Sequence, residues 1–574
     1  MLNEAGVNDI TGDKAIGNDI TGNEASASKS VRSETLETET SLPNFRQGDA
    51  IILYERNRDT DNVTNKMVFK GNIEYLTENE IGIRLRATQQ NPSVLPAESL
   101  YAIEHDTMDT TFRSMYQGLY IYLSARKERR DLLLSQRPPR FDESLDSMIS
   151  RSEDDFTRIA LKAKAAQDYF LLIGPPGTGK TSCALKKMVE TFHADKDAQI
   201  LLLSYTNRAV DEICKSLASI APAVDFIRVG SELSCDEAYR GHLIENELSS
   251  CNRRSEVYER IRNCRIIVGT VAAISGKPEL FRLKHFDVAI IDEATQILEP
   301  QLLGILCARG EDGKDAIDKF VLIGDHKQLP AVVQQNTEQS AIYDESLLSI
   351  GLTNLKDSLF ERLYRNCTAT VHRSYDMLCR QGRMHPEVAL FANRAFYGGR
   401  LIPVGLPHQI ESSDTICRLA FYPSVPEKAG ASAKINYSEA RIVADLAVRI
   451  YEDHQTDFDE SRTLGIITPY RSQIALIKKE IESLGIPALN RILVDTVERF
   501  QGSERDVIIY SFCVNYPYQL KFLSNLTEEE GVLIDRKLNV ALTRARKQMF
   551  ITGVPELLER NPLYKSLLKL IESF

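Results

Sequence analysis

The stretch Tyr169-Phe170-Leu171-Leu172-Ile173-Gly174-Pro175-Pro176-Gly177-Thr178-Gly179-Lys180-Thr181 decides the fold class. Its last eight residues match G-x-x-x-x-G-K-[ST], the pattern of a phosphate-binding loop. The five residues before the loop form an apolar run of strand length, and residues 182–189 are typical of a helix. Strand, loop and helix in this order are the context that the pattern needs, so we favour this interpretation over a chance glycine-rich turn.

The loop residues predict how a nucleoside triphosphate is held. Glycines allow backbone N–H groups to turn toward a phosphate, and the helix N-terminus adds partial positive charge. Lys180 is expected to reach the β- and γ-phosphates, and the Thr181 hydroxyl is expected to bind Mg²⁺. The candidate nucleotide-binding residues are Gly174, Pro175, Pro176, Gly177, Thr178, Gly179, Lys180 and Thr181.

Composition limits the classes of protein that remain. A chain of 574 residues predicts three or four domains, at roughly one per 100–200 residues. The net charge of −11 means that nucleic acid would have to bind in a local basic channel. The ten cysteines contain no C-x-x-C pair, which indicates reduced thiols without a zinc or iron–sulfur module. With no apolar run of 18 residues and no secretory signal, we expect no membrane partner and a cytoplasmic protein, nuclear if the source is eukaryotic.

The chain divides into four predicted parts. Residues 1–43 are polar and carry a ten-residue repeat, which predicts a disordered tail. Residues 44–136 predict a small antiparallel β-barrel followed by a helical stalk over 111–135, whose basic residues 126–130 we interpret as a solvated face rather than a localisation signal. Residues 137–367 predict an α/β domain that contains the loop and a charged helical insertion at 235–263, and residues 368–574 a second α/β domain without a loop.

Polar residues follow the predicted parallel strands, where ligands of such sheets bind. In the pair Asp292-Glu293 one carboxylate can hold Mg²⁺ while its neighbour polarises the attacking water, in preference to a solvated acid pair. The Gln328 side chain can detect the γ-phosphate by a hydrogen bond to it or to the attacking water. In the second domain, Arg383 and Arg544 are either surface residues or cations that contact the transferring phosphoryl group.

The chain resembles superfamily 1 helicases of subgroup B over about residues 44–555. The segments that carry the resemblance, in the order of the family, are DEATQ (292–296), DHKQLP (325–330), RMHP (383–386), VDTVERFQGSE (494–504) and LNVALTRAR (538–546). SLFERL (358–363) and RPPRF (137–141) are most similar to the helicase half of the nuclease-helicases that trim Okazaki flaps. The RNA helicases of nonsense-mediated decay come next.

The resemblance implies a fold of two tandem RecA-like P-loop NTPase domains and a role for each matching residue. Lys180 and Thr181 would bind phosphate and Mg²⁺, Asp292 would bind Mg²⁺, and Glu293 would be catalytic. Gln328, Arg383 and Arg544 would sense the γ-phosphate, and Glu504 would hold the ribose. The residues implied to line the channel for single-stranded nucleic acid are Thr206, Asn207, Thr270, Pro469 and Thr496.

Two departures from the family concern base recognition. The family usually has a tyrosine that stacks on adenine where this chain has Gly382. It also has a glutamine about eighteen residues before the loop, whereas residues 154–158 contain none and Gln167 is too close to the loop. ATP is the expected substrate with a relaxed base preference, unless Phe156 or Tyr169 takes over the stacking. The 43 residues before the barrel are too few for a nuclease domain, so no nuclease is expected.

Three functions remain open at this point. The leading one is an ATP-driven helicase that moves 5′→3′ on DNA, and the second is an RNA helicase of the same family. The third is a nucleotide-gated clamp or scaffold on nucleic acid that does not unwind. We expect the bound single strand to be DNA rather than RNA, and no protein partner can be named.

The departures at the base site generate a prediction about nucleotide choice. The contacts to the triphosphate and the ribose do not depend on which base the nucleotide carries. GTP, and as a further case CTP, should therefore be hydrolysed with kcat/KM within about tenfold of that for ATP. Measured kcat/KM values for the four nucleotides check this. A preference for ATP beyond about a hundredfold would contradict it.

Overall fold

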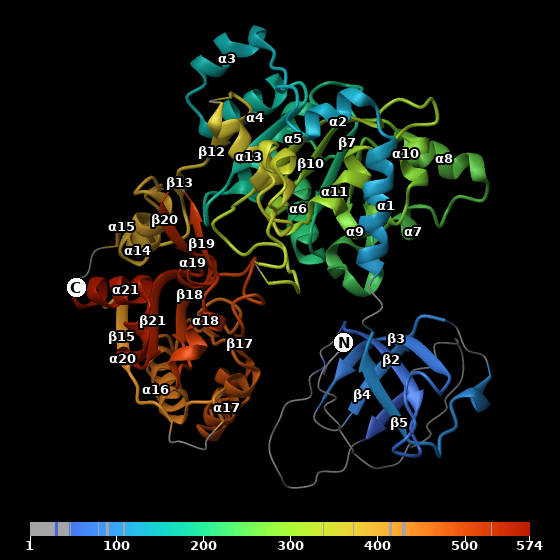
Figure 1. The fold of residues 1–574 in the computed structure, drawn as a ribbon. Coiled ribbons are helices and arrows are strands. Elements are labelled where there is room, and N and C mark those ends of the chain that lie inside the picture. Colours follow the sequence, from blue (N-terminus) through green and yellow to red (C-terminus); the bar gives the residue numbers. More distant parts are fainter. Residues whose placement is uncertain are drawn as a thin grey trace. The chain divides into compact units, whose positions relative to one another are not determined.

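The computed structural model describes residues 29–32, 45, 48–77, 80–87, 91–106, 110–336, 338–370, 372–411, 416–427, 432–529 and 531–573. The chain forms two compact units, residues 1–110 and 111–574, which are described separately (Figure 1). No helix among the described residues is long and apolar enough to cross a membrane.

The first unit is an antiparallel sheet with the strand order β1-β4-β3-β2-β5. Its strands are β1 (Lys29–Arg32), β2 (Ala50–Glu55), β3 (Val68–Leu76), β4 (Glu80–Leu85) and β5 (Tyr101–His105). Alternating apolar residues bury one face, with Ile51, Leu53, Ile73 and Ile83 at its centre. The small antiparallel β unit is thus confirmed. Strand β1 lies within residues 1–43, which were predicted to be a disordered tail, and it pairs with β4. The rest of that predicted tail lies outside the described residues.

The second unit contains two parallel sheets, and the first has the order β12-β6-β11-β10-β7-β9-β8. Its strands are β6 (Tyr169–Ile173), β7 (Ile200–Ser204), β8 (Phe226–Val229), β9 (Ile266–Thr270), β10 (Phe286–Ile291), β11 (Ile317–Gly324) and β12 (Tyr375–Met377). Because both faces are covered, the central strands are mostly apolar, as in YFLLI of β6 and ILLLS of β7. Tyr169, Leu171 and Ile173 of β6 enter one core, and Phe170 and Leu172 enter the other.

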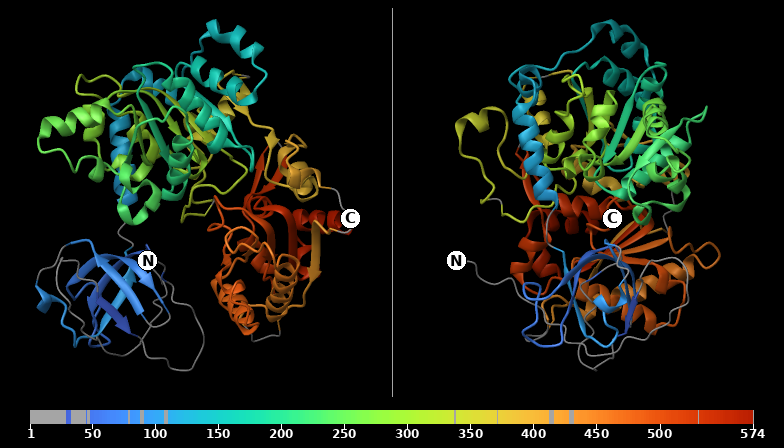
Figure 2. Two further views of the ribbon diagram at one scale, coloured as in Figure 1. Left: turned by 180° about the vertical axis from the view of Figure 1, so that it is seen from behind. Right: turned by 90° about the vertical axis from the view of Figure 1, so that its right-hand side faces the viewer.

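Helices cover both faces of this sheet (Figure 2). Helices α4, α5 and α6 pack on the face of Phe170, whereas α2, α9, α11 and α13 pack on the face of Tyr169. The helices of this part are α1 (Thr110–Ser124), α2 (Lys127–Leu133), α3 (Asp146–Arg151), α4 (Asp155–Ala165), α5 (Lys186–His193), α6 (Asn207–Ala218), α7 (Ile244–Glu247), α8 (Arg254–Asn263), α9 (Val271–Ser275), α10 (Glu279–Leu283), α11 (Glu299–Leu306), α12 (Glu345–Ser349) and α13 (Leu359–Ala369).

The predicted stalk is two helices rather than one, because the chain breaks between α1 and α2. Gly118 allows α1 to lie directly on α11, since a Cβ atom there would come within 2.1 Å of the Pro300 carbonyl oxygen. The predicted solvated face is wrong for Arg129, which is only 5% exposed. Its guanidinium donates to the carbonyl oxygens of Ile317 and Asp318, at the start of β11. The basic run therefore includes a structural contact.

The second sheet has the order β15-β21-β18-β16-β17, again parallel. Its strands are β15 (Leu419–Pro423), β16 (Leu464–Ile467), β17 (Leu493–Asp495), β18 (Arg505–Ser511) and β21 (Ala545–Gly553). Two short pairs, β13 (Arg380–Gln381) with β14 (Ile402–Pro403) and β19 (Leu526–Glu529) with β20 (Val532–Asp535), lie beside it. The helices are α14 (Pro386–Tyr397), α15 (Pro407–Ile410), α16 (Tyr437–Asp453), α17 (Arg471–Ser483), α18 (Leu520–Leu523), α19 (Arg536–Leu542), α20 (Pro555–Leu558) and α21 (Pro562–Glu572).

The α/β fold with two parallel sheets is confirmed, but the border between them differs from the predicted 367/368. Helix α13 runs through that position, and β12 pairs with β6 of the first sheet. The crossing therefore comes after Met377. The reason is that a short polar segment, which the sequence did not mark as a strand, completes the edge of the first sheet.

A buried carboxylate fixes the entry into the first sheet. Asp168, next to β6, accepts hydrogen bonds from Arg137 Nη1 and Nη2 at 2.9 Å and from Arg140 Nη2 at 2.9 Å. Burial opposes ionisation, but the two arginines prevail and hold the pKa of Asp168 well below its usual range. The RPPRF segment singled out in the sequence is thus an anchor.

This anchor generates a prediction about stability. Asp168→Asn should lower the free energy of unfolding by about 1–2 kcal/mol at pH 7, a modest figure because the Arg140 side chain is 66% exposed and screened by solvent. A carboxylate whose pKa is lower in the folded protein stabilises the fold at pH values above its unfolded pKa of about 3.9. This contribution is lost as the pH falls below that value toward the folded pKa. Urea unfolding should therefore show the two proteins converging as pH falls below about 4. Glu153→Gln, on an exposed side chain, is the control; an equal gap at both pH values would contradict the prediction.

Candidate nucleotide-binding site

The phosphate-binding loop connects β6 to a helix that begins with a π-type turn at Lys180–Leu185 and continues as α5. Gly177 and Gly179 have φ angles of 73° and 74°, a left-handed conformation that only glycine adopts readily. A Cβ atom at Gly174 would lie 2.8 Å from Lys180 Cβ, so the lysine side chain lies across this glycine. The structure thus places the predicted loop residues in one continuous cradle.

The acid pair after β10 faces the loop. Thr181 Oγ1 donates a hydrogen bond to Asp292 Oδ2 at 2.5 Å, and Lys180 Nζ lies 2.8 Å from Glu293 Oε1. Glu293 has a positive φ of 53°, uncommon for a residue with a side chain and a sign of strain at functional sites. Gln296 Nε2 donates to Glu293 Oε2 at 2.8 Å and fixes its orientation.

The two acids differ in pKa because Lys180 contacts Glu293 directly. Asp292 is 1% exposed, and burial together with the neighbouring Glu293 charge raises its pKa to about 6. For Glu293 burial acts in the same direction, but the Lys180 cation outweighs it and the pKa is lowered. Asp292 therefore lacks a cation of its own, with the Thr181 hydroxyl beside it. Two hard oxygen donors, the Thr181 hydroxyl and the under-compensated Asp292 carboxylate, fit Mg²⁺.

Residues of the second sheet complete the site from the other side. Arg544 is 3% exposed, and its Nη2 donates to Gln328 Oε1 at 3.0 Å. Its other hydrogen bonds go to the carbonyl oxygens of Val540 and Ser503. Burial, with the nearby Arg383 charge, lowers the pKa of Arg544 to about 9. A phosphate arriving here would supply the negative charge that this guanidinium lacks.

Arg383 lies against the loop itself. The Gly382 N–H donates to the Gly177 carbonyl oxygen at 2.8 Å, and a Cβ atom at Gly177 would lie 2.4 Å from Arg383 Cβ. Arg383 Nε donates to Glu504 Oε2 at 2.5 Å. Glu504, the predicted ribose ligand, is thus the ionic partner of Arg383, whose charge lowers the pKa of Glu504 against the effect of burial.

A buried network that the sequence reasoning missed joins the two sheets behind the site. Asp325, Tyr397 and Asn539 are each at most 1% exposed. Tyr397 Oη donates to Asp325 Oδ2 at 2.7 Å, and Asn539 Nδ2 donates to Tyr397 Oη at 2.8 Å. Asp325 Oδ2 also accepts from Gln328 Nε2 at 2.8 Å. Asp325 and Asn539 lie in the DHKQLP and LNVALTRAR segments but were given no role from the sequence, and Tyr397 has the pattern of an ordinary core residue of α14.

The predicted nucleic-acid residues fall into two groups, one at the carboxyl edge of each sheet. Thr206 follows β7, and Thr270 is the last residue of β9, in register with Ser204 of β7. Asn207 begins α6. Both threonine hydroxyls accept from helix N–H groups, those of Ala209 and Ala273. Pro469 and Thr496 follow the adjacent strands β16 and β17.

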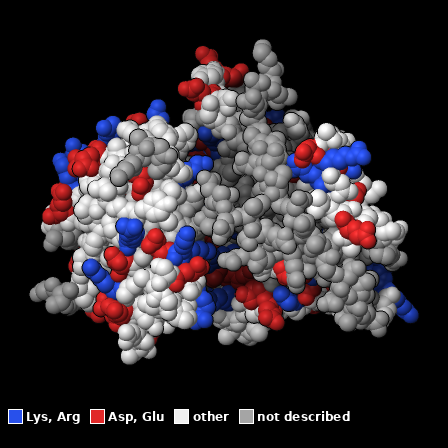
Figure 3. Space-filling model, turned by 90° about the horizontal axis from the view of Figure 1, so that it is seen from below, with Lys and Arg blue, Asp and Glu red and all other residues white. Residues whose placement is uncertain are grey.

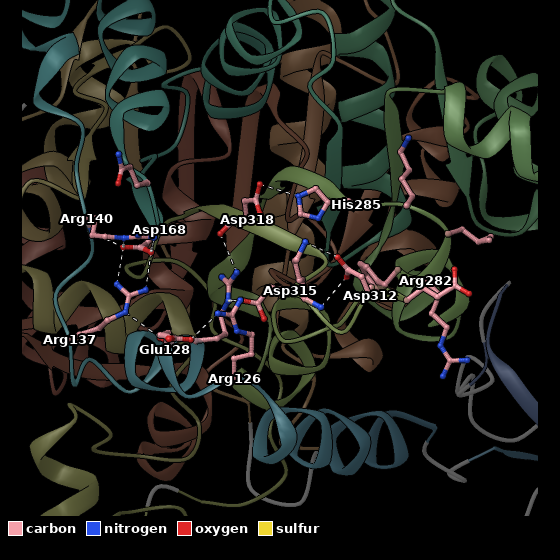
Figure 4. A pocket seen from close by; sticks show the side chains of 18 of the residues that line it. Arg126, Glu128, Arg137, Arg140, Asp168, Arg282, His285, Asp312, Asp315 and Asp318 are labelled. Carbon is pink, nitrogen blue, oxygen red and sulfur yellow. Dashed lines mark hydrogen bonds and ion pairs between the residues drawn. The ribbon is translucent and has the colours of Figure 1, made fainter.

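Surface charge does not gather in one field on the face drawn in Figure 3, where basic and acidic side chains are interspersed. A cavity of about 1180 Å³ opens at a different place, beside α2 and the turn before β11. Several of its charged side chains pair with one another, as Figure 4 shows for Arg137 with Asp168 and for His285 with Asp318. None of the predicted site residues lines this cavity.

Comparison with known proteins agrees with this geometry. Two family models, each described as an AAA domain, match residues 355–556 and residues 151–257 with 244–336. Two parallel sheets that share one phosphate loop, with arginines of the second facing the first, define the class: the chain contains two P-loop NTPase-type α/β domains and resembles superfamily 1 helicases.

Among the proteins that the chain is similar to are several described as DNA replication ATP-dependent helicase/nucleases. It is 27% identical to the DNA replication ATP-dependent helicase/nuclease JHS1 of Arabidopsis thaliana, over 94% of this chain and 40% of that protein. It is 29% identical to the DNA replication ATP-dependent helicase/nuclease DNA2 of Gallus gallus, over 83% of this chain and 45% of that protein. The chain thus spans less than half the length of these two relatives.

A solved structure of a complex of Arterivirus nonstructural protein 10 (helicase) with DNA also aligns with this chain. It is 12% identical, with a TM-score of 0.38, over 91% of this chain and 80% of that chain.

The loop and the acid pair generate a prediction about turnover. Lys180→Ala should abolish nucleotide hydrolysis, because Lys180 is the cation that faces the acid pair from the loop. Glu293→Gln should still bind nucleotide but hydrolyse it at least about 10²-fold more slowly, as expected for the loss of a positioned base. Steady-state phosphate release measures both, with Lys186→Ala, whose Nζ donates to Ser219, as a matched control. Normal turnover by Glu293→Gln would remove that residue from the catalytic role.

Proposed function

We propose that the chain is an ATP-dependent helicase that unwinds DNA by moving 5′→3′ along one strand. The observation that carries this proposal is the contact of Arg544 with Gln328, at 3.0 Å, which closes the nucleotide site with residues of both sheets. A site divided in this way couples nucleotide state to the relative position of the sheets. The names of the relatives, DNA replication helicase/nucleases, support DNA as the track.

Each site residue has a proposed role. Lys180 binds the β- and γ-phosphates, Glu293 orients and deprotonates the attacking water, and Gln328, Arg383 and Arg544 contact the γ-phosphate. Thr181 and Asp292 would hold Mg²⁺, which neutralises charge on the phosphate oxygens when bound. When nucleotide binds, the Arg383–Glu504 ion pair separates: Arg383 then contacts the γ-phosphate, and Glu504 binds the ribose. The Lys180–Glu293 ion pair opens when nucleotide enters, which frees both side chains for these contacts.

The strand is proposed to cross the carboxyl edges of both sheets. Thr206, Asn207 and Thr270 bind it on the first sheet, and Pro469 and Thr496 bind it on the second, mostly through backbone phosphates. ATP binding brings the two sheets together and hydrolysis lets them separate. The strand-binding residues of the first sheet and those of the second then bind the strand tightly in turn, and this moves it. The proposed location is the cytoplasm, or the nucleus if the source is eukaryotic, and no membrane partner is proposed.

A strand-displacement assay tests this function. Hydrolysis should rise when single-stranded DNA is added, and a duplex with a 5′ single-stranded tail should open while one with a 3′ tail should not. Binding should weaken steeply with salt because counterions are released. Opening of only the RNA duplex would replace the DNA track by RNA, and stimulation of hydrolysis without any opening would favour a clamp. Preferential opening of the 3′-tailed duplex would reject the polarity, and hydrolysis that does not respond to oligonucleotides would reject translocation.

A further inference from the structure

The neighbouring strands β10 and β11 carry charged side chains near their amino ends, although most of both strands is apolar. His285 directly precedes β10, Asp287 is the second residue of β10, and Asp318 is the second residue of β11. Phe286 pairs with Ile317 in the register of these parallel strands. The next residue of each strand is an aspartate, so the Asp287 and Asp318 carboxylates lie side by side.

The three side chains come together on one face of the sheet. Side chains two residues apart in an extended chain point to the same side, which places His285 beside Asp287. His285 Nε2 lies 3.0 Å from Asp318 Oδ2, and Figure 4 shows the two side chains pointing toward one another. The ligand atoms of all three residues lie within 4.8 Å of one another, and this is the only such group of three histidine, cysteine or acidic side chains among the residues that the structure describes.

The two carboxylates have little charge compensation from the protein. Like charges side by side on neighbouring strands repel each other. Among the described residues, neither carboxylate forms an ion pair with a lysine or an arginine. Asp318 pairs with His285, and Asp287 Oδ2 accepts a hydrogen bond from the Gln199 N–H at 2.7 Å. This end of the sheet therefore holds two acids that only an imidazole and a neutral N–H contact.

Two cations nearby are engaged with other groups. The Lys284 amine donates to Gln199 Oε1 and to a backbone carbonyl oxygen. The Arg129 guanidinium donates to carbonyl oxygens at the start of β11, and its Nε lies 3.5 Å from Asp315 Oδ2. Neither cation contacts the two carboxylates, so a cation from solution is the group that would balance their charge.

We propose that His285, Asp287 and Asp318 bind a divalent transition-metal ion, Zn²⁺ in particular. One imidazole nitrogen and two carboxylate oxygens are ligands that Zn²⁺ takes, whereas Mg²⁺ prefers oxygen ligands alone. Ligand atoms around a tetrahedral zinc are roughly 3.3 Å apart, given bonds of about 2.1 Å. The 3.0 Å between His285 Nε2 and Asp318 Oδ2 is close to this separation. These two side chains are 50% and 60% exposed, so they have room to rotate toward the third ligand.

The zinc site is of the open kind. Three protein ligands leave the fourth position of a tetrahedral zinc for water or for another donor. His285 and Asp318 line the cavity of about 1180 Å³ described above, so this fourth position opens toward the cavity. The ion also joins the amino ends of β10 and β11, and binding to the folded state alone stabilises that state. None of the ligands is a cysteine, so the spacing of the cysteines gives no sign of the site.

Calorimetric titration of the chelator-treated full chain with Zn²⁺ tests the site without nucleotide. His285→Ala and Asp318→Asn should each weaken zinc binding by at least about tenfold, because losing a ligand costs no less than losing the outer partner of one. Zn²⁺ should also raise the Tm of the unaltered protein more than that of either variant. Excess Mg²⁺ should not displace the zinc. Asp292→Asn, in the candidate Mg²⁺ site, should keep the zinc affinity, which separates the two metal sites.

His454→Ala is the matched control. His454 Nδ1 lies 3.3 Å from Asp457 Oδ1, a histidine–aspartate pair that belongs to no three-ligand group in the described part of the chain. This variant should bind zinc as the unaltered protein does. An equal loss in His454→Ala and His285→Ala would overturn the site, because it would indicate binding by exposed histidines in general.

A ligand exchange decides between a metal site and an ordinary ion pair. His285→Cys replaces one zinc ligand by another, so it should keep the zinc binding that His285→Ala loses. A thiol does not restore the His285–Asp318 ion pair, so a purely structural role predicts no such recovery. This variant also keeps the test valid if the alanine variant folds poorly. Equal zinc affinity in the unaltered protein, His285→Ala and Asp318→Asn would overturn the proposal and leave an ion pair at this place.

Discussion

The buried hydroxyl of Tyr397 is the point on which the nucleotide site depends. It donates to Asp325 of the first sheet's part and accepts from Asn539 of the second, with all three side chains shielded from water. Buried polar groups are costly unless paired, so separating the two parts here would leave each group unsatisfied. Asp325 in turn holds Gln328, which meets Arg544. The reacting groups are thus positioned by one polar chain that crosses from sheet to sheet.

Charge balance explains why so many ionisable groups are buried together. Two cations of the site have carboxylate partners: Lys180 has Glu293, and Arg383 has Glu504. Outside the site, Arg536 at the start of α19 has Glu361 of α13 at 2.6 Å. The Arg544 cation and the Asp292 carboxylate are not in such pairs, and their pKa values are lowered and raised respectively. Perturbed pKa values of this kind mark functional sites, because a ligand with both charges restores the balance. A phosphate with its metal carries both.

Local patterns in the sequence predicted the loop, the acid pair and most strands. The strand 169–173 was predicted with its observed bounds, because an apolar run between a polar segment and glycines has few other solutions. The burial of Arg129 could not be predicted, since a basic run in a helix gives no sign of which residue meets a strand end. Neither could β12, whose pairing with β6 brings together residues about 200 positions apart. Tyr397 and Asn539 were missed for the same reason: their partner is chosen by tertiary packing.

The contact between Gly382 and Gly177 bears on how information passes through the molecule. One backbone hydrogen bond of 2.8 Å joins the glycine-rich loop after β6 to the segment that leads into the second sheet's part. Communication between distant sites is usually sought as a chain of intermediate side chains. Here the path has a length of one bond, made by backbone atoms that every residue type except proline can supply. Sequence variation would leave little trace of it, and the steric demand at Gly177 is its visible signature.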